Sequence, residues 1–371
     1  MPAERPEKML NSMILQDETD GRQEHCRRLP DTPDFRLPED VAIAFDCDGV
    51  LVDTRNSYDI AAVKTINELL SHRYGNLYGI GNIVERLLFR LRLTGEYNND
   101  WDSTYAITVI ASIALSETER KERVPEDTKV LERIGNLTEI FISSGYSIFD
   151  DGIRRFIHTF GDEELRSSVL KFENSLEYAS KYRNSRLART FDAYYYGDSM
   201  YTEIYGKAPE MSRGEGLINN ELKVLDGHNA AKLRTISKNR MAMVTGRPFQ
   251  SVARVLGNSM NYFNMDASIF LGDFDIDDKR LLKYRKPNPD ALLRCMKYFG
   301  VDTLLYCGNG IEDIQMAKKA KILDSGVIFA GICGYSSYPV ELAGYFRNQD
   351  AEIIASDLTE LTSVLQSFTE S

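Results

Sequence analysis

A series of short apolar runs, each ending in polar residues or glycine, constrains the fold more than any other feature. The first run is Val41–Phe45; it stops at Asp46-Cys47-Asp48-Gly49, and Tyr58–Leu70 then has a helical pattern. Such runs are typical of fully buried parallel strands. Later strands are predicted at Met241–Val244, Ser268–Leu271, Thr303–Cys307, Gly326–Ala330 and Glu352–Ile354, and helices at Phe249–Leu256, Asp290–Tyr298, Glu312–Ala320 and Leu358–Phe368. Repeated strand–helix units predict an α/β fold with a Rossmann-like, doubly wound parallel sheet.

The stretch between the first strand and the later ones has a different pattern. Residues 58–230 show apolar residues at helical spacing and no repeated strand. We therefore expect a large α-helical domain, 58–230, inserted into an α/β core made of residues 39–57 and 231–371. Residues 1–38 are polar and proline-rich, and we expect an N-terminal extension with little structure of its own.

Composition excludes several classes of protein. The net charge is −11, from 45 Lys and Arg and 56 Asp and Glu, which opposes general binding to nucleic acid or to anionic membranes. The five cysteines have no CxxC spacing, as expected in a reducing compartment. The longest apolar stretch, Ile107–Leu115, is too short to span a membrane, and the N-terminus has no signal-peptide core. We expect a soluble, cytoplasmic protein, and the sequence leaves open whether it forms a homo-oligomer.

The first strand ends in two carboxylates that suggest chemistry. Ligand sites of parallel sheets lie at the carboxyl ends of the strands. Asp46 is placed there to attack phosphorus and form an acyl phosphate, while Asp48 could protonate the leaving oxygen and later activate water. Gly49 permits a sharp turn beside a ligand. The alternative is an ordinary surface turn, in which Asp and Gly are common.

With three further segments, this one resembles the haloacid-dehalogenase-like superfamily. Asp46–Thr54 is similar to its first motif, Val244–Pro248 to the second, Lys286–Pro289 to the third and Gly308–Asp313 to the fourth. The resemblance implies that Thr245 hydrogen-bonds a phosphoryl oxygen with help from the Gly246 amide, and that Lys286 neutralises Asp46 and the phosphoryl group. It also implies a helical cap between motifs one and two, and Mg²⁺ as cofactor.

The fourth motif departs from the family pattern, because its first acid is replaced by Asn309. Magnesium prefers oxygen ligands, and an amide oxygen can serve as one. The metal set implied is Asp46, the backbone carbonyl of Asp48, and Asp313, with Asn309 direct or one water removed. The missing charge motivates an alternative: a catalytically weakened binding or regulatory protein.

Two features of the insert are candidates for substrate recognition. The polar segment Gly95–Asp102 contains Asn98, Asn99 and Trp101, the only tryptophan; with Glu215-Gly216 and Thr245–Pro248 it resembles a small clade of capped superfamily members. Arg183 and Arg186, spaced by three, could share a helix face and bind a second anion. The alternatives are a helix N-terminus with a buried tryptophan and a solvated basic face.

Together these features predict Mg²⁺-dependent hydrolysis of a small phosphorylated metabolite, a phosphomonoester, through an aspartyl-phosphate. A phosphomutase would use the same pair of aspartates. A dehalogenase is disfavoured, because it does not need the second acid at Asp48.

Overall fold

The structure is a computed structural model. It describes residues 37–75, 77–97, 99–119, 127–147, 151–273 and 282–369. Residues 1–36, most of the predicted N-terminal extension, lie outside the described part of the chain.

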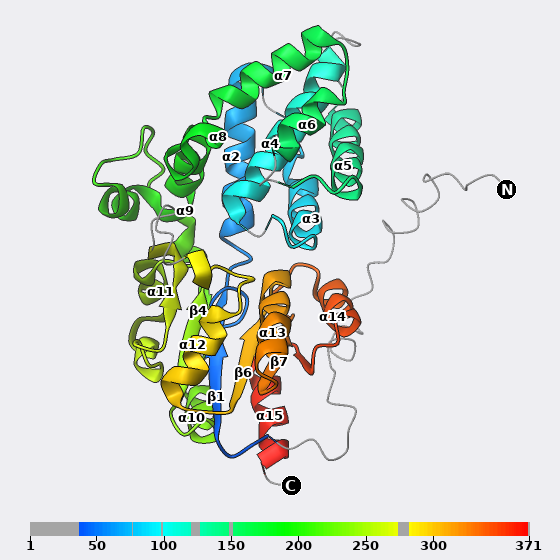
Figure 1. The fold of residues 1–371 in the computed structure, drawn as a ribbon. Coiled ribbons are helices and arrows are strands. Elements are labelled where there is room, and N and C mark those ends of the chain that lie inside the picture. The colour runs from blue at the N-terminus through cyan, green and yellow to red at the C-terminus, as the bar shows by residue number, and fades with distance from the viewer. Residues whose placement is uncertain are drawn as a thin grey trace, which may run out of the picture.

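A parallel sheet of six strands forms the core (Figure 1). The strand order is β5-β4-β1-β6-β7-β8, and every neighbouring pair is parallel. The strands are β1 (Val41–Phe45), β4 (Met241–Thr245), β5 (Ile269–Phe270), β6 (Thr303–Gly308), β7 (Val327–Ile332) and β8 (Ile353–Ala355). This confirms the predicted α/β fold with a doubly wound parallel sheet.

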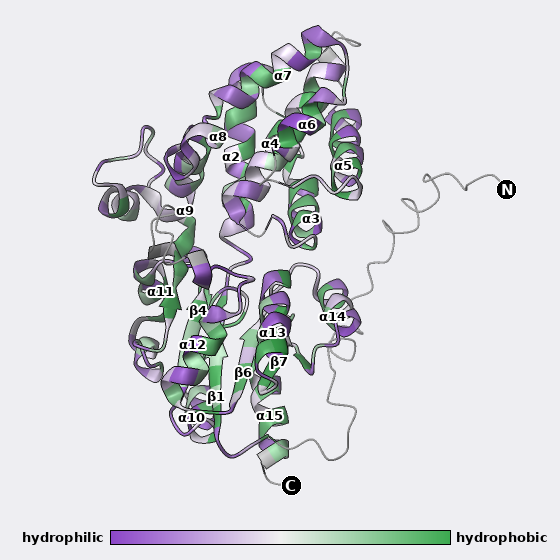
Figure 2. Ribbon diagram, viewed as in Figure 1, coloured by the Kyte–Doolittle hydropathy of each residue, from purple (hydrophilic) through white to green (hydrophobic). Residues whose placement is uncertain are grey.

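Helices cover both faces of the sheet, which explains why β1 is apolar at every position. Ala42 and Ala44 belong to one hydrophobic cluster, whereas Val41, Ile43 and Phe45 belong to another on the opposite face. The first cluster takes side chains from α12 (Asp290–Phe299), α13 (Ile311–Leu323) and α14 (Pro339–Asn348), and the second from α10 (Gly227–Ile236), α11 (Phe249–Leu256) and α15 (Leu358–Thr369). Figure 2 shows hydrophobic central strands between helices that carry both hydrophobic and hydrophilic residues.

The large insertion is helical, as predicted, and we call it the cap. Its helices are α2 (Tyr58–Tyr74), α3 (Gly81–Arg92), α4 (Asp100–Glu119), α5 (Asp127–Ser143), α6 (Gly152–His158), α7 (Glu163–Ser175), α8 (Tyr178–Lys181) and α9 (Arg186–Tyr205). A third hydrophobic cluster, within residues 61–218, fills the cap. Helix α4 runs through its centre, and the hydroxyls of Thr108 and Ser112 are satisfied there by backbone carbonyls of the same helix.

No helix in the described part of the chain combines the length and hydropathy that a membrane span requires.

The cap contacts the core at its linkers and through helix α3. Two linkers join them, and strands β2 (Val52–Asp53) and β3 (Leu222–Lys223) pair antiparallel where these linkers pass each other. Elsewhere, Arg86 of α3 forms an ion pair with Glu341 of α14 and lies over the Tyr338 ring at 4.5 Å. The cap therefore lies against the carboxyl edge of the sheet (Figure 1).

Packing around β7 yields a stability prediction. Gly331 lies beneath Phe346 of α14, and a Cβ at Gly331 would come within 2.4 Å of the Phe346 ring. Overpacking of this kind costs about 1–3 kcal/mol. We expect Gly331→Ala to lower the free energy of unfolding by that amount in urea titrations.

Gly344 is the matched control, because it lies within α14 with open space where a Cβ would stand. Alanine there should stabilise the protein by about 0.5–1 kcal/mol. Equal effects at the two glycines would contradict the packing argument.

Candidate active site

The candidate site lies where three parallel strands end. Asp46 follows β1, Gly246 follows β4 and Asn309 follows β6. Two of these loops touch, because Gly49 has φ +64° and a Cβ there would come within 1.8 Å of Asn309 Nδ2. Gly49 therefore serves two purposes: it adopts a left-handed backbone and leaves room for Asn309.

A cavity of about 500 Å³ lies between these loops and the cap. The core supplies Asp46, Asp48, Gly246, Lys286 and Asn309 to its lining, and the cap supplies Phe89, Asn99, Trp101, Tyr182, Arg183 and Tyr196. Both ends carry charged side chains, and most of the aromatic rings come from the cap.

A buried lysine organises the charged end. Lys286 Nζ lies 2.8 Å from Asp46 Oδ1 and 2.7 Å from Asp313 Oδ1. Burial alone would lower the pKa of Lys286, but Asp313 and Asp46 raise it well above its usual value. The ammonium is therefore a fixed positive charge beside Asp46.

Asp313 has both carboxylate oxygens occupied. Oδ1 accepts from Tyr306 and Lys286, and Oδ2 accepts from the backbone N–H groups of Asn309 and Gly310. Asp313 thus fixes both Lys286 and the loop after β6. A direct bond from Asp313 to a metal would displace one of these donors.

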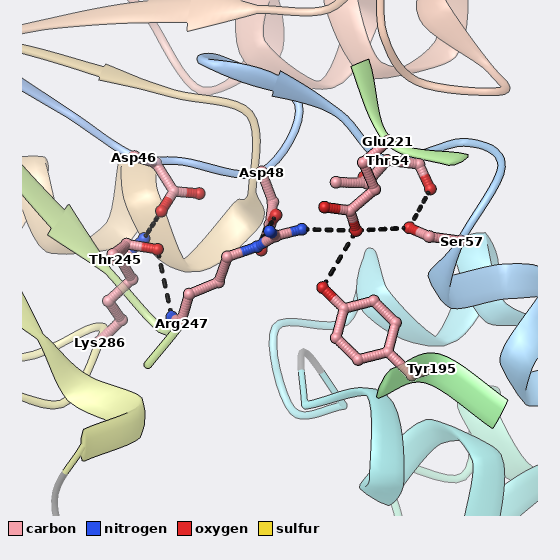
Figure 3. A network of polar contacts seen from close by, with 9 residues as sticks. All are labelled: Asp46, Asp48, Thr54, Ser57, Tyr195, Glu221, Thr245, Arg247 and Lys286. Carbon is pink, nitrogen blue, oxygen red and sulfur yellow. Dashed lines mark hydrogen bonds and ion pairs between the residues drawn. The ribbon is translucent and has the colours of Figure 1, made fainter. Parts of the chain in front are cut away.

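A second buried cation, Arg247, holds Asp48 (Figure 3). Its Nε donates to Asp48 Oδ1 at 2.5 Å and its Nη2 to Glu221 Oε1 at 2.7 Å. The same Glu221 oxygen accepts from the hydroxyls of Ser57 and Tyr195. We call Asp48, Arg247, Glu221, Ser57 and Tyr195 the Arg247 cluster.

Carboxylates crowd this end of the cavity. Burial raises the pKa of Asp46 to about 7, with Lys286 opposing and Asp313 and Asp48 adding to the rise. Burial likewise raises the pKa of Glu312 to about 7 and that of Asp48 to about 6, although Lys286 and Arg247 oppose these shifts. Each pKa rises because the carboxylate is removed from water and lies near other negatively charged side chains.

The predicted core residues come together, with one difference of position. Thr245 is fully buried at the end of β4, and its Oγ1 accepts from the Arg247 backbone N–H. Gly246 beside it is exposed and lines the cavity. The backbone after β4 thus faces the cavity, while the Thr245 hydroxyl shapes the turn.

Among the predicted cap residues, Asn99, Trp101 and Arg183 line the cavity and Arg186 does not. Asn98 lies outside the described residues. Asn99 Oδ1 accepts from the Trp101 N–H at the start of α4, and Trp101 Nε1 donates to Asp192 at 2.9 Å. The predicted shared helix face does not form, because Arg183 lies in a 3₁₀ turn and α9 begins only at Arg186, capped by Ser185.

The donor set suits a hard divalent cation in charge and in ligand type. Oxygens of Asp46, Glu312 and the Asn309 amide line one cavity, and carboxylates there outnumber Lys286 and Arg247. No cluster of three or more Asp, Glu, His or Cys side chains arranged for a metal occurs among the described residues. Asp46 and Asp313 share Lys286 in the same way, so both can contribute oxygens, and backbone carbonyl and amide oxygens would complete the site.

No sequence pattern marks Glu221 and Tyr195 as partners of Arg247. Glu221 and Tyr195 come from segments with no motif, so only the folded structure brings them to Arg247. Glu312 lies within the fourth motif, next to Asp313, and this position was its only signal in the sequence.

Comparisons with known proteins agree with this architecture. A model of the haloacid dehalogenase-like hydrolase family matches residues 41–321. An X-ray structure from the Northeast Structural Genomics Consortium is similar at 18% identity and a TM-score of 0.55, covering 89% of this chain and 99% of that chain. Phosphatase Tt82 from Thermococcus thioreducens is similar at 19% identity and a TM-score of 0.44, covering 78% of this chain and 92% of that chain. No match was found among curated proteins.

The structure with a TM-score of 0.55 supports the fold alone, whereas the family model spans most of the chain and includes all the strand-end loops of the site. The protein belongs to the haloacid dehalogenase-like hydrolases.

Proposed function

We propose that the protein hydrolyses a small phosphomonoester with Mg²⁺ as cofactor, through a phosphorylated Asp46. One observation carries the proposal: Asp46 and Asp48 face the same cavity, and each is held by a different buried cation. Two carboxylates in separate surroundings suit two separate roles, nucleophile and acid–base.

The chain's own groups supply each step. An Asp46 oxygen bonds to phosphorus as the bond to the leaving oxygen breaks, and Asp48 donates a proton to that oxygen. Asp48 then takes a proton from water, whose oxygen attacks phosphorus and frees Asp46 and phosphate. Lys286 and the Gly246 amide balance charge on the phosphoryl oxygens.

Asp46, the Asp48 backbone carbonyl, Asp313 and Asn309 would hold the cation, and Asp313 also fixes the loop after β6. When bound, Mg²⁺ would offset negative charge on the carboxylates and the phosphoryl group.

Phosphate release from a panel of phosphorylated metabolites tests the proposal. We expect wild-type protein with Mg²⁺ to release phosphate from at least one of them. Asp46→Asn should abolish turnover while leaving the fold intact, because an amide keeps the shape but is not a nucleophile. Thermal melts of both proteins check the fold.

Activity above roughly a few per cent in Asp46→Asn would contradict the covalent step. Isomerised substrate without phosphate would indicate a mutase, and binding without turnover a regulatory protein.

The metal site gives a second prediction. Asn309→Asp adds a carboxylate beside the Gly49 turn, so Mg²⁺ affinity measured by calorimetry should rise, and half-maximal activity should need less Mg²⁺. Asn288→Asp, in the loop after Lys286, is the control for added charge. If Asn309→Asp leaves the affinity unchanged, Asn309 is not near the ion.

The cap end is proposed to bind the rest of the substrate. Arg183 lines the cavity, where its charge also acts on the carboxylate of Asp192. We expect Arg183→Ala to lower kcat/KM about tenfold, or about 1.4 kcal/mol, for a metabolite carrying a second anion.

Arg186, three residues away and outside the cavity lining, provides the matched control. Arg186→Ala should leave kcat/KM for the metabolite within about twofold of wild type. Neither change should affect 4-nitrophenyl phosphate, which has no second anionic group. If kcat/KM for the metabolite falls equally in both variants, Arg183 has no specific role in substrate recognition.

A further inference from the structure

The Arg247 cluster joins the core to the cap through one guanidinium. Arg247 comes from the loop after β4, and its side chain is 1% exposed. Glu221 comes from the linker that returns from the cap, and its side chain is fully buried. Ser57 precedes α2, the first cap helix, and Tyr195 lies in α9, the last. Both linkers and both ends of the cap therefore meet at this cluster.

Aromatic contacts strengthen the junction. The Arg247 guanidinium lies over the Tyr58 ring at 5.2 Å, and Tyr58 stacks on Tyr195 with centroids 4.4 Å apart. A guanidinium is planar and rigid, so it can donate to two carboxylates while stacking on a ring. Movement of α2 or α9 relative to the core would change these contacts.

Glu221 contacts the groups that line the cavity only through Arg247 and Tyr195, and its charge adds to the rise in the pKa of Asp48. It does not line the cavity, whereas Asp48, Arg247 and Tyr195 do. Its Oε1 atom accepts three hydrogen bonds: from Arg247 at 2.7 Å, from Ser57 at 2.7 Å and from Tyr195 at 3.0 Å. Such convergence fixes the direction of the guanidinium, and the guanidinium in turn fixes the Asp48 carboxylate.

We propose that Glu221 and Arg247 are positioning residues for Asp48, and that through Ser57 and Tyr195 they make the orientation of Asp48 depend on the position of the cap. This rests on the proposed function, in which Asp48 protonates the leaving oxygen. If Asp48 is displaced, hydrolysis should slow most for substrates whose leaving oxygen most needs a proton.

Two aryl esters of similar size measure this directly. Nitrophenolate leaves from 4-nitrophenyl phosphate with little need of a proton, whereas phenyl phosphate releases a more basic oxygen. Asp48→Asn should slow phenyl phosphate about 100-fold or more and 4-nitrophenyl phosphate much less. Glu221→Gln should slow phenyl phosphate about tenfold, with less than about threefold on the nitrophenyl ester.

The chain offers a matched control at another buried glutamate. Glu173 in α7 is 1% exposed and accepts from Tyr105 and Arg154, but it does not line the cavity. Glu173→Gln removes a comparable charge, so it should lower the melting temperature without changing the ratio of the two rates.

A milder pair of variants tests the link to the cap. These variants also test the proposal if Glu221→Gln does not fold. Tyr195→Phe removes one donor to Glu221, and Tyr105→Phe removes one donor to Glu173. We expect only Tyr195→Phe to slow phenyl phosphate selectively. In the Asp48→Asn background, adding Glu221→Gln or Tyr195→Phe should cost less than about twofold more, since the group they position is already lost.

The outcomes separate the two proposals. If wild-type protein hydrolyses neither ester nor any metabolite, the proposed function fails and this inference with it. If Asp48→Asn is selective but Glu221→Gln and Tyr195→Phe slow both esters equally, the function stands and the positioning role is overturned. Additive losses in the double variants would overturn it as well.

Discussion

The carboxyl ends of β1, β4 and β6 lie along one edge of a parallel sheet, and the site depends on this constraint. Loops that follow neighbouring strands are brought together, so Asp46, Gly246 and Asn309 meet although 263 positions separate the first from the last. Parallel strands require crossover connections, and the helices of these crossovers bury both faces of the sheet. The cap lies against the carboxyl edge of the sheet, where these loops are.

Two buried cations divide the acids of the site between them. Lys286 holds Asp46 and Asp313, and Arg247 holds Asp48 and Glu221. Each cation would be costly to bury alone, and its two partners offset that cost. The division leaves Asp46 and Asp48 in different surroundings although one residue separates them. Their distinct proposed roles follow from this difference.

The sequence predicted what depends on local pattern. Buried strands such as Val41–Phe45 are apolar throughout, and the loops after them carry recognisable polar groups. Helix α14 was not predicted, because Gly344 weakens the helical pattern in its middle, although Pro339 stands at its first position, where proline is favoured. The spacing of Arg183 and Arg186 suggested one helix face, but Ser185 starts a new helix between them. The contacts of Arg247 are tertiary. Glu221 and Ser57, for example, are 164 positions apart in the sequence, so no local pattern could predict that they meet.

The sharing of Arg247 by two acids also limits how this protein can diverge. Replacing Glu221 alone leaves a buried guanidinium with one partner, and replacing Arg247 alone leaves a buried carboxylate with none of its charge balanced. Breaking a buried pair in this way costs about 3–5 kcal/mol, a large part of the roughly 5–15 kcal/mol that keeps a domain folded. A single substitution at either position thus gives a less stable protein, and a stable change requires that both residues be replaced together. Among descendants of this chain, positions 221 and 247 should therefore vary together or not at all.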